Sequence, residues 1–304
     1  MPMSDNEPDE LRDLYLNWAE RMAANPEMGL PELRDMFDEW QSAGIEPTDV
    51  LYEEGERGGV RTLTAIADST PGRPVVMHLH GGGFVAGSTA SHRKFAGHLA
   101  KALGGRVVLV DYRLAPESPF PEPPSDALAV YRALLEDDGV DPAVLTVSGD
   151  SAGGNLALTA ALRAAGEGLP RPASLLLFSP FVDQLHTGDT LTSNQTTDAI
   201  VSKPVLELMT GLYLGGKTGG DNPEVNALHA VLSGLPRTYV LVSSTEGLYA
   251  DSVRLVERAV DAGVDATLAA VDGQQHVFVL AAGRSSEADD QLATAARWVL
   301  DGQS

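Results

Sequence analysis

Short runs of β-branched and other apolar residues alternate with helical segments along this sequence, and that alternation most constrains how it can fold. Each run has the length of a buried strand, and segments such as HRKFAGHLAKALGG and SDALAVYRALLED, which lie between runs, have the composition of helices. Strands that alternate with helices form a mostly parallel sheet with helices on both faces. We therefore predict an α/β fold from about residue 60 onward. The runs are PVVMHLH, GRVVLVDY, AVLTVSG, ASLLLFSP, RTYVLVSS and ATLAAV.

Two regions depart from this alternation. In residues 8–43 the apolar positions recur every three or four residues, which predicts two amphipathic helices broken at Asn25-Pro26 and stopped at Gly44. Residues 185–225 interrupt the alternation between two consecutive predicted strands with polar sequence and one helical piece, KPVLELMTGLYL. We therefore predict a helical cap from residues 1–45 and a cap insertion at about 185–225, within a catalytic domain that spans 46–304.

Charge and composition exclude several kinds of partner. The chain has 43 acidic and 21 basic residues, a formal net charge of -22, so nucleic acid and anionic membrane surfaces would repel it. The sequence has no cysteine, which excludes disulfides, thiolate metal sites and a cysteine nucleophile. The first ten residues are acidic and lack the apolar stretch of a secretory signal. These features predict a cytoplasmic protein.

The run AVLTVS ends in a glycine-rich turn that contains a serine. Gly149, Ser151 and Gly153 match the pattern G-x-S-x-G, in which small residues let the chain turn sharply from strand to helix and hold the serine strained and exposed. Ligands of such folds sit beyond the carboxyl ends of the strands, where this serine would lie. We interpret Ser151 as a nucleophile; the alternative is an ordinary serine in a glycine-rich turn.

A second glycine-rich stretch, HGGGF at 80–84, follows the run PVVMHL. Its backbone N–H groups could bind the oxyanion of a reacting ester. There is a rival interpretation, because Gly81, Gly83 and Ala86 fit G-x-G-x-x-[GA] and Asp111 ends the next run, as in dinucleotide-binding proteins. That rival leaves the turn around Ser151 unexplained, whereas a hydrolase uses both turns.

A nucleophilic serine needs a base, and in this type of fold the chain order is serine, acid, histidine. Three histidines follow Ser151. His186 falls in the predicted cap, and His229 precedes a strand with no earlier strand end that could supply an acid. His276 lies directly after the last predicted strand, in DGQQHVF, and is the candidate base. The alternative for a lone loop histidine is a solvated surface residue.

The acid is expected at the end of the preceding strand. Glu246, in SSTEGLYADS, is the first carboxylate after RTYVLVSS and would orient the imidazole of His276. Asp251 is the second candidate, but it immediately precedes a helical run and is expected to act as a helix N-cap. Asp272, in the DGQQ turn, is the third candidate.

The motifs together resemble those of a known family. HGGGF at 80–84, DYRLAPESPFP at 111–121 and GDSAGGN at 149–155 are similar to the motifs of the bacterial hormone-sensitive-lipase family (family IV) of α/β-hydrolase esterases. The resemblance runs from about residue 60 to the C-terminus. The N-terminal helices and the segment LAAGRSSEADDQLATAARWV also resemble monoterpene ε-lactone hydrolases of this family.

The resemblance implies roles for individual residues. Carried over by position, Ser151 is the nucleophile, His276 the base, and the N–H groups of Gly82, Gly83 and Ala152 form the oxyanion hole. Neither a metal nor an organic cofactor is implied.

One branch of the family supplies a glutamate acid within E-x-L-L-D-D-S. Glu246 begins EGLYADS in this chain, so that branch matches better than the more frequent aspartate branch. Tyr249 and Ala250 depart from the pattern of the branch.

Further residues of the motifs are assigned supporting parts. His80, Asp111 and Arg113 are expected to make hydrogen bonds that support the oxyanion loop, and Asp150 to support the nucleophile from behind. Candidates for contact with the substrate are Phe84 and four residues of the predicted N-terminal helices, Trp18, Met22, Phe37 and Trp40. For the aromatic side chains at helical spacing, simple packing is the alternative.

The expected activity is hydrolysis of short-chain acyl esters through a covalent serine ester. A lactone hydrolase acting on a cyclic ester is the alternative, and a catalytically inactive ligand-binding protein of the same fold is a distant one. The expected partner is therefore a small-molecule ester. Family members often dimerise, which leaves a homodimer open.

Overall fold

The computed structural model describes residues 10–303. The first nine residues of the predicted cap segment therefore lie outside the described part of the chain. The strands form one eight-stranded sheet in the order β1-β2-β4-β3-β5-β6-β7-β8. Their bounds are β1 Leu51–Arg57, β2 Val60–Ile66, β3 Val75–Leu79, β4 Arg106–Val110, β5 Leu145–Asp150, β6 Ser174–Phe178, β7 Arg237–Ser243 and β8 Ala266–Val271.

Strands β3 to β8 are the six predicted runs, and they pair in parallel. The central strands β3, β5 and β6 are buried along their whole length, which explains why they read as unbroken apolar runs. The α/β prediction is therefore confirmed, and the carboxyl ends of these strands meet at one edge of the sheet.

The hairpin β1–β2 was not predicted and makes the sheet mixed, because β2 pairs antiparallel with both β1 and β4. Strand β1 (LYEEGER) is mostly exposed and carries four charged residues, so it lacks an apolar signal. The turn Gly58-Gly59 has positive φ at both positions, as a two-residue hairpin loop of type I′ requires. That glycine pair is the one sequence signal that could have revealed the hairpin.

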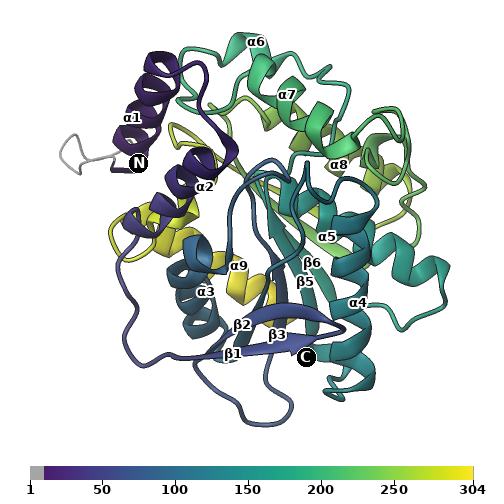
Figure 1. Ribbon diagram of the computed structural model, residues 1–304. Coiled ribbons are helices and arrows are strands. Elements are labelled where there is room, and N and C mark those ends of the chain that lie inside the picture. Colours follow the sequence, from purple (N-terminus) through teal and green to yellow (C-terminus); the bar gives the residue numbers. More distant parts are fainter. Residues whose placement is uncertain (1–9, 304) are drawn as a thin grey trace.

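Helices cover both faces of the sheet. The helices are α1 Glu10–Ala24, α2 Leu30–Asp38, α3 Thr89–Leu103, α4 Glu122–Glu136, α5 Ala152–Gly166, α6 Thr190–Ser193, α7 Lys203–Leu214, α8 Tyr249–Asp261 and α9 Ser286–Asp301, with 3-10 turns at Glu39–Ser42, Pro142–Val144, Ala227–His229 and Phe278–Ala281. Figure 1 shows α3 and α9 on one side of the sheet and α4 and α5 on the other. Two apolar cores result, one on each face.

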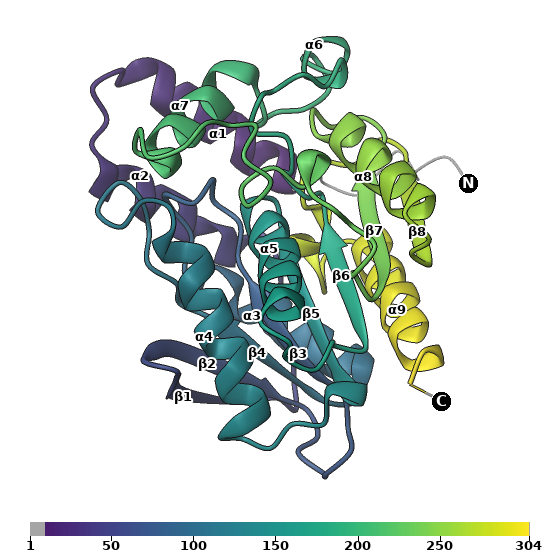
Figure 2. The same cartoon turned by 90° about the vertical axis from the view of Figure 1, so that its right-hand side faces the viewer.

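The segments predicted as a cap lie above the sheet edge where the parallel strands end. Helices α1 and α2 approach from one side, and α6 and α7, which follow β6 and precede β7 in the chain, approach from the other (Figure 1). Figure 2 shows both pairs of helices above the sheet. Both breaks expected from the sequence are observed, since α1 ends at Ala24 and the turn after α2 ends at Ser42. None of the helices in residues 10–303 combines the length and apolar character that crossing a membrane requires.

Candidate active site

Ser151 stands between the end of β5 and the start of α5. Its backbone has φ 49° and ψ -119°, a conformation that costs energy in a residue with a side chain and is typical of a serine presented on a sharp turn. The flanking glycines are required by space. A Cβ on Gly149 would lie 2.1 Å from the carbonyl oxygen of Gly153, and one on Gly153 would lie 1.9 Å from that of Leu79.

Glu246 and His276 come together from loops that follow neighbouring strands, β7 and β8. The Nδ1 atom of His276 lies 3.0 Å from Oε1 of Glu246, and both side chains are buried. Because an ionised carboxylate only accepts hydrogen bonds, Nδ1 carries the proton and Nε2 is left as the proton acceptor. His276 and Ser151 line the same cavity.

The pKa of His276 is set by two opposing effects. Burial alone would lower it, but the Glu246 carboxylate reverses this and raises the pKa of the imidazole above its ordinary value. The carboxylate thereby stabilises the imidazolium that forms when His276 takes a proton. The pair can therefore serve as general base and its orienting acid.

Further contacts, which the sequence analysis missed, fix this pair. The hydroxyl of Ser179, directly after β6, donates to Oε2 of Glu246 over 2.7 Å, and the N–H of Ser243 donates to the same oxygen over 3.1 Å. Tyr15 of α1 donates its hydroxyl to the carbonyl oxygen of His276 over 2.9 Å. Because Ser179 directly follows a strand, its position in the sequence could have indicated a role near the site. Tyr15 lies within a helix, and its position in the sequence gives no such indication.

The cap insertion also supports the acid. Asp198 accepts from the N–H of Gly247 over 2.7 Å, and Asn194 donates to the carbonyl oxygen of Glu246 over 2.9 Å. The loop that presents Glu246 is thus held by side chains distant in sequence.

Of the three residues expected to form the oxyanion hole, Gly82 and Gly83 share the cavity of Ser151, and Ala152 directly follows the serine in the chain. Gly82 and Gly83 have φ values of +110° and +62°, and both line the cavity with Ser151. Ala152 is the first residue of α5, where the helix dipole favours negative charge. A Cβ on Gly83 would lie 1.9 Å from Sδ of Met209, so α7 packs directly on this loop.

Asp150 lies behind the turn in a buried polar cluster. Its Oδ1 accepts from the N–H of Gly81 over 3.0 Å and lies 3.1 Å from Nε2 of both His78 and His92. Three such groups could in principle hold a metal ion. Because Nδ1 of His78 also bonds Ser148 over 3.0 Å, we interpret the cluster as hydrogen-bonded support for the turn, as predicted for Asp150.

The cavity at the serine is small, at about 100 Å³, and mostly apolar. Its lining residues are Met22, Leu33, Phe37, Trp40, Gly82, Gly83, Val85, Ser151, Phe181, Ile200, Val201, Val205, Leu206, Leu208, Met209, Leu212 and His276. Residues from α1, α2 and α7 therefore close it from both halves of the cap.

Of the residues expected to contact the substrate, Met22, Phe37 and Trp40 line this cavity, whereas Trp18 and Phe84 do not. Trp18 is fully buried and stacks on Phe37 with ring centroids 5.0 Å apart. Phe84 is also fully buried and lies parallel to Tyr213 at 3.8 Å. Both rings pack behind the cavity wall; for Trp18 this is the packing alternative that the sequence left open, whereas for Phe84 no such alternative was considered.

The N-cap interpretation of Asp251 is wrong. Helix α8 begins at Tyr249, so Asp251 lies inside its first turn and is buried. The carboxylate accepts from the backbone N–H groups of Val182 and Asp183 and pairs with Arg254. Burial raises the pKa of Asp251 to about 7. This residue joins the root of the cap insertion to α8 and has no contact with His276.

The supporting roles assigned to Asp111 and Arg113 also need correction. Asp111 pairs with Arg61, and Arg113 makes a bidentate ion pair with Asp126. Neither ion pair includes a residue of the oxyanion loop. Asp272, the third candidate acid, accepts from Ser244 over 2.7 Å.

His80 does contribute to the oxyanion loop. Its Nδ1 bonds the carbonyl oxygen of Gly81 over 2.8 Å, and its own carbonyl oxygen accepts from the Tyr112 hydroxyl over 2.8 Å. The expected supporting role of His80 therefore agrees with these contacts.

Comparison with known proteins adds independent findings. A family model described as the alpha/beta hydrolase fold matches residues 76–280. The chain is 35% identical to an esterase of Acinetobacter venetianus, over 88% of this chain and 86% of that protein. It is 33% identical to an acetyl-hydrolase of Streptomyces hygroscopicus, over 91% and 90% of the two chains.

Solved structures agree with these sequence comparisons. The crystal structure of an esterase from the bacterial hormone-sensitive lipase family superimposes with a TM-score of 0.90 at 35% identity, covering 98% of this chain and 100% of the other. These findings favour the hydrolase interpretation of the two glycine-rich turns over a dinucleotide site.

Proposed function

Because the chain belongs to the α/β-hydrolase family, together with esterases related to hormone-sensitive lipase, we propose that its serine esterase activity is carried by Ser151, His276 and Glu246. The protein is a carboxylic-ester hydrolase that acts on small-molecule esters. The single observation that best supports these roles is the buried His276–Glu246 pair in the cavity of a strained serine.

The reaction follows from this arrangement. His276 removes the hydroxyl proton of Ser151 as the oxygen attacks the ester carbonyl, and the N–H groups of Gly82, Gly83 and Ala152 receive the oxyanion. Collapse of the tetrahedral intermediate expels the alcohol, which takes the proton from His276. His276 then removes a proton from water as the water attacks the acyl-enzyme, and the bond to Ser151 breaks as the Ser151 oxygen takes that proton back and the carboxylic acid leaves.

The cavity supports a short acyl group. Its volume of about 100 Å³ is far below the roughly 300–1,000 Å³ of sites for drug-sized ligands. A terpene-sized lactone would require the cap to move. A small lactone remains chemically equivalent, because ring opening uses the same acyl transfer. A panel of p-nitrophenyl esters of increasing chain length, together with small and terpene lactones, tests this substrate class.

The remaining features are also proposals. We propose that α1–α2 and the insertion at 185–225 act as one cap over the cavity, which their shared lining of it supports. Homodimerisation and a cytoplasmic location stay predictions, to be tested by sedimentation and by cell fractionation.

The pH dependence of the reaction should report on His276. The imidazole must be neutral to accept a proton, so kcat/KM should fall as the pH drops through its pKa. Since Glu246 raises that pKa, the midpoint of the acid limb is expected above the ordinary value of ~6.5. Initial rates on a short-chain ester, with stability checked at each pH, measure this. A midpoint well below that value would contradict the Glu246–His276 interaction.

Met209 should limit the length of the acyl chain. Its side chain is 8% exposed, lines the cavity and rests on Gly83, so Met209→Ala enlarges the space beside the oxyanion glycines. We expect kcat/KM for p-nitrophenyl octanoate, relative to the acetate, to rise about 10-fold or more, the scale of a change in pocket fit.

Glu207→Ala is the matched control for this prediction. Glu207 lies on the same helix but is exposed and does not line the cavity, so its truncation should leave the chain-length ratio unchanged. A thermal melt is needed as well, because emptying a buried methionine site costs about 2–5 kcal/mol. An unchanged ratio in a folded Met209→Ala protein would exclude Met209 from the acyl site.

A further inference from the structure

Two loops without regular structure lie against each other, and the first of them lines the cavity of the serine. One is the oxyanion loop, residues 80–87, and the other follows β4, residues 111–118. They touch at Tyr112, whose hydroxyl donates to the carbonyl oxygen of His80, and at Ala115, whose N–H donates to the carbonyl oxygen of Phe84 over 2.9 Å. With glycines at 81, 82, 83 and 87, the oxyanion loop has little intrinsic stiffness.

Arg34 of the cap helix α2 binds both loops at once. Its Nε donates to the carbonyl oxygen of Val85 over 2.8 Å, and its Nη2 donates to that of Ala115 over 3.0 Å. Val85 and Ala115 are both fully buried, so these carbonyl groups need donors from within the protein. One planar guanidinium therefore joins the two loops.

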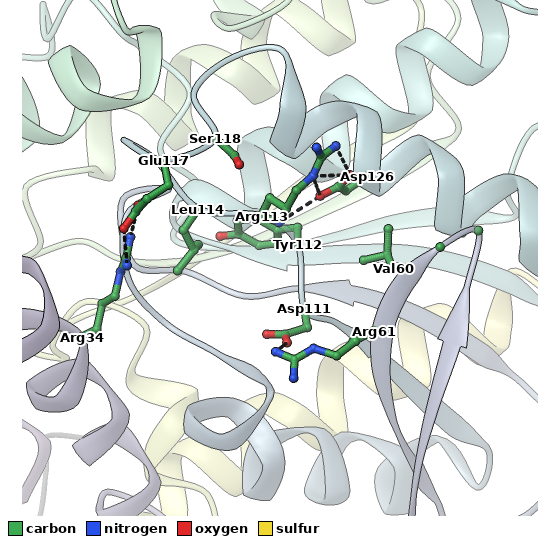
Figure 3. A pocket seen from close by; sticks show the side chains of 12 residues that line it. Arg34, Val60, Arg61, Asp111, Tyr112, Arg113, Leu114, Glu117, Ser118 and Asp126 are labelled. Carbon is green, nitrogen blue, oxygen red and sulfur yellow. Dashed lines mark hydrogen bonds and ion pairs between the residues drawn. The ribbon is translucent and has the colours of Figure 1, made fainter.

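Glu117 fixes the orientation of that guanidinium. It accepts a bidentate pair of hydrogen bonds from Arg34, over 2.9 and 2.7 Å, and Arg34 lowers the pKa of this carboxyl to about 2. Figure 3 shows the pair at the edge of a surface cleft of about 690 Å³ that also contains Asp111 and Arg113. A lysine in place of Arg34 could not make this fork, because its ammonium is a point charge.

The same helix forms part of the cavity wall. Leu33 and Phe37, on either side of Arg34 in α2, line the cavity, and so does Val85. Asp38, one turn further on, accepts a hydrogen bond from Ser88 just after the oxyanion loop. Helix α2 is thus bound to the loop through Arg34 at its middle and to the residue after the loop through Asp38 at its C-terminal end.

We propose that Arg34 is a positioning residue that holds the oxyanion loop in its reactive geometry from the N-terminal cap. The inference rests on the proposed function, because it assigns Gly82 and Gly83 to the oxyanion hole. It goes beyond a covering role for the cap: α2 acts on the chemical step, not only on access of the substrate. Donors held in advance of the reaction are what make such a hole effective.

The test compares kcat with KM in Arg34→Ala. For p-nitrophenyl acetate we expect kcat to fall about 10- to 100-fold with KM changed less than about 3-fold, a smaller loss than removal of an oxyanion donor itself. Binding of butylboronic acid, which forms a tetrahedral adduct on the serine, should weaken by a similar factor. Arg34→Lys, with one ammonium in place of the fork, should lie between the wild type and Arg34→Ala.

Arg21→Ala is the matched control. Arg21 forms an ion pair with Glu39 inside the cap, with both side chains 38% exposed, and has no contact with either loop. Its loss should leave kcat and the boronic acid affinity unchanged. Thermal melts of all variants separate unfolding from lost positioning.

Two results would overturn the proposal. One is an Arg34→Ala protein with wild-type kcat and boronic acid affinity but a raised KM for long acyl chains, which would make α2 a passive wall. The other is an equal loss in Arg21→Ala. Wild-type turnover in the same assay keeps these outcomes distinct from failure of the esterase assignment itself.

Discussion

Replacing Ser151 with alanine is expected to lower kcat for a short-chain ester by about 10⁴- to 10⁶-fold, the scale seen when a triad nucleophile is removed. Only the hydroxyl group is removed, and alanine adopts the same strained backbone conformation, with φ 49°, that the serine already adopts. We therefore expect the fold to survive. Initial rates measured beside a thermal melt check both statements.

A covalent probe sharpens this experiment. A fluorophosphonate should label the wild-type protein with one equivalent and leave Ser151→Ala unlabelled. Ser69→Ala, at an exposed site between β2 and β3, serves as the control and should retain both rate and labelling. Turnover by Ser151→Ala at the wild-type rate would exclude the proposed mechanism.

Glu246→Gln is expected to reduce the rate by up to about 10⁴-fold while the protein stays folded. The reason lies in the contacts of Oε2. Ser179 and Ser243 both donate to that oxygen, so the single oxygen of glutamine would take its place and the amide nitrogen would face His276. An N–H group facing Nδ1 favours the tautomer with the proton on Nε2, which cannot accept the proton of Ser151.

Asp251→Asn provides the contrast. Asparagine cannot accept both backbone N–H groups and the Arg254 guanidinium without turning its own N–H₂ toward a donor. A loss of about 1–3 kcal/mol in the free energy of unfolding is expected, with little change in the rate of the folded enzyme. Should Asp251→Asn be folded but inactive, and Glu246→Gln active, Asp251 would be the acid.

The sequence alone was sufficient for the features that depend on local spacing. Strands buried on both faces read as apolar runs, so β3 to β8 were predictable, and so was the sheet edge where their ends meet. Ser151 and His276 were proposed as nucleophile and base because each follows the end of such a run. Glu246 was chosen over Asp251 by the same rule, and its hydrogen bond to His276 agrees with that choice.

Features that depend on distant partners were decided only by the tertiary structure. Strand β1 is charged and exposed, so its composition does not predict a strand. Its extended conformation comes from antiparallel pairing with β2. The burial of Trp18 behind the cavity is set by rings on other segments. An aromatic residue at helical spacing looks the same in a sequence whether it packs against a neighbour or faces a substrate.

The supporting residues show the physical reason most directly. Asp251 meets its partners 68 and 69 residues away, Ser179 meets Glu246 67 residues away, and Arg34 reaches Val85 51 residues away. A local pattern constrains the backbone of the few residues that carry it. The choice of hydrogen-bond partner for a buried polar group depends instead on which donors the packed chain brings within about 3 Å, which only the assembled fold determines.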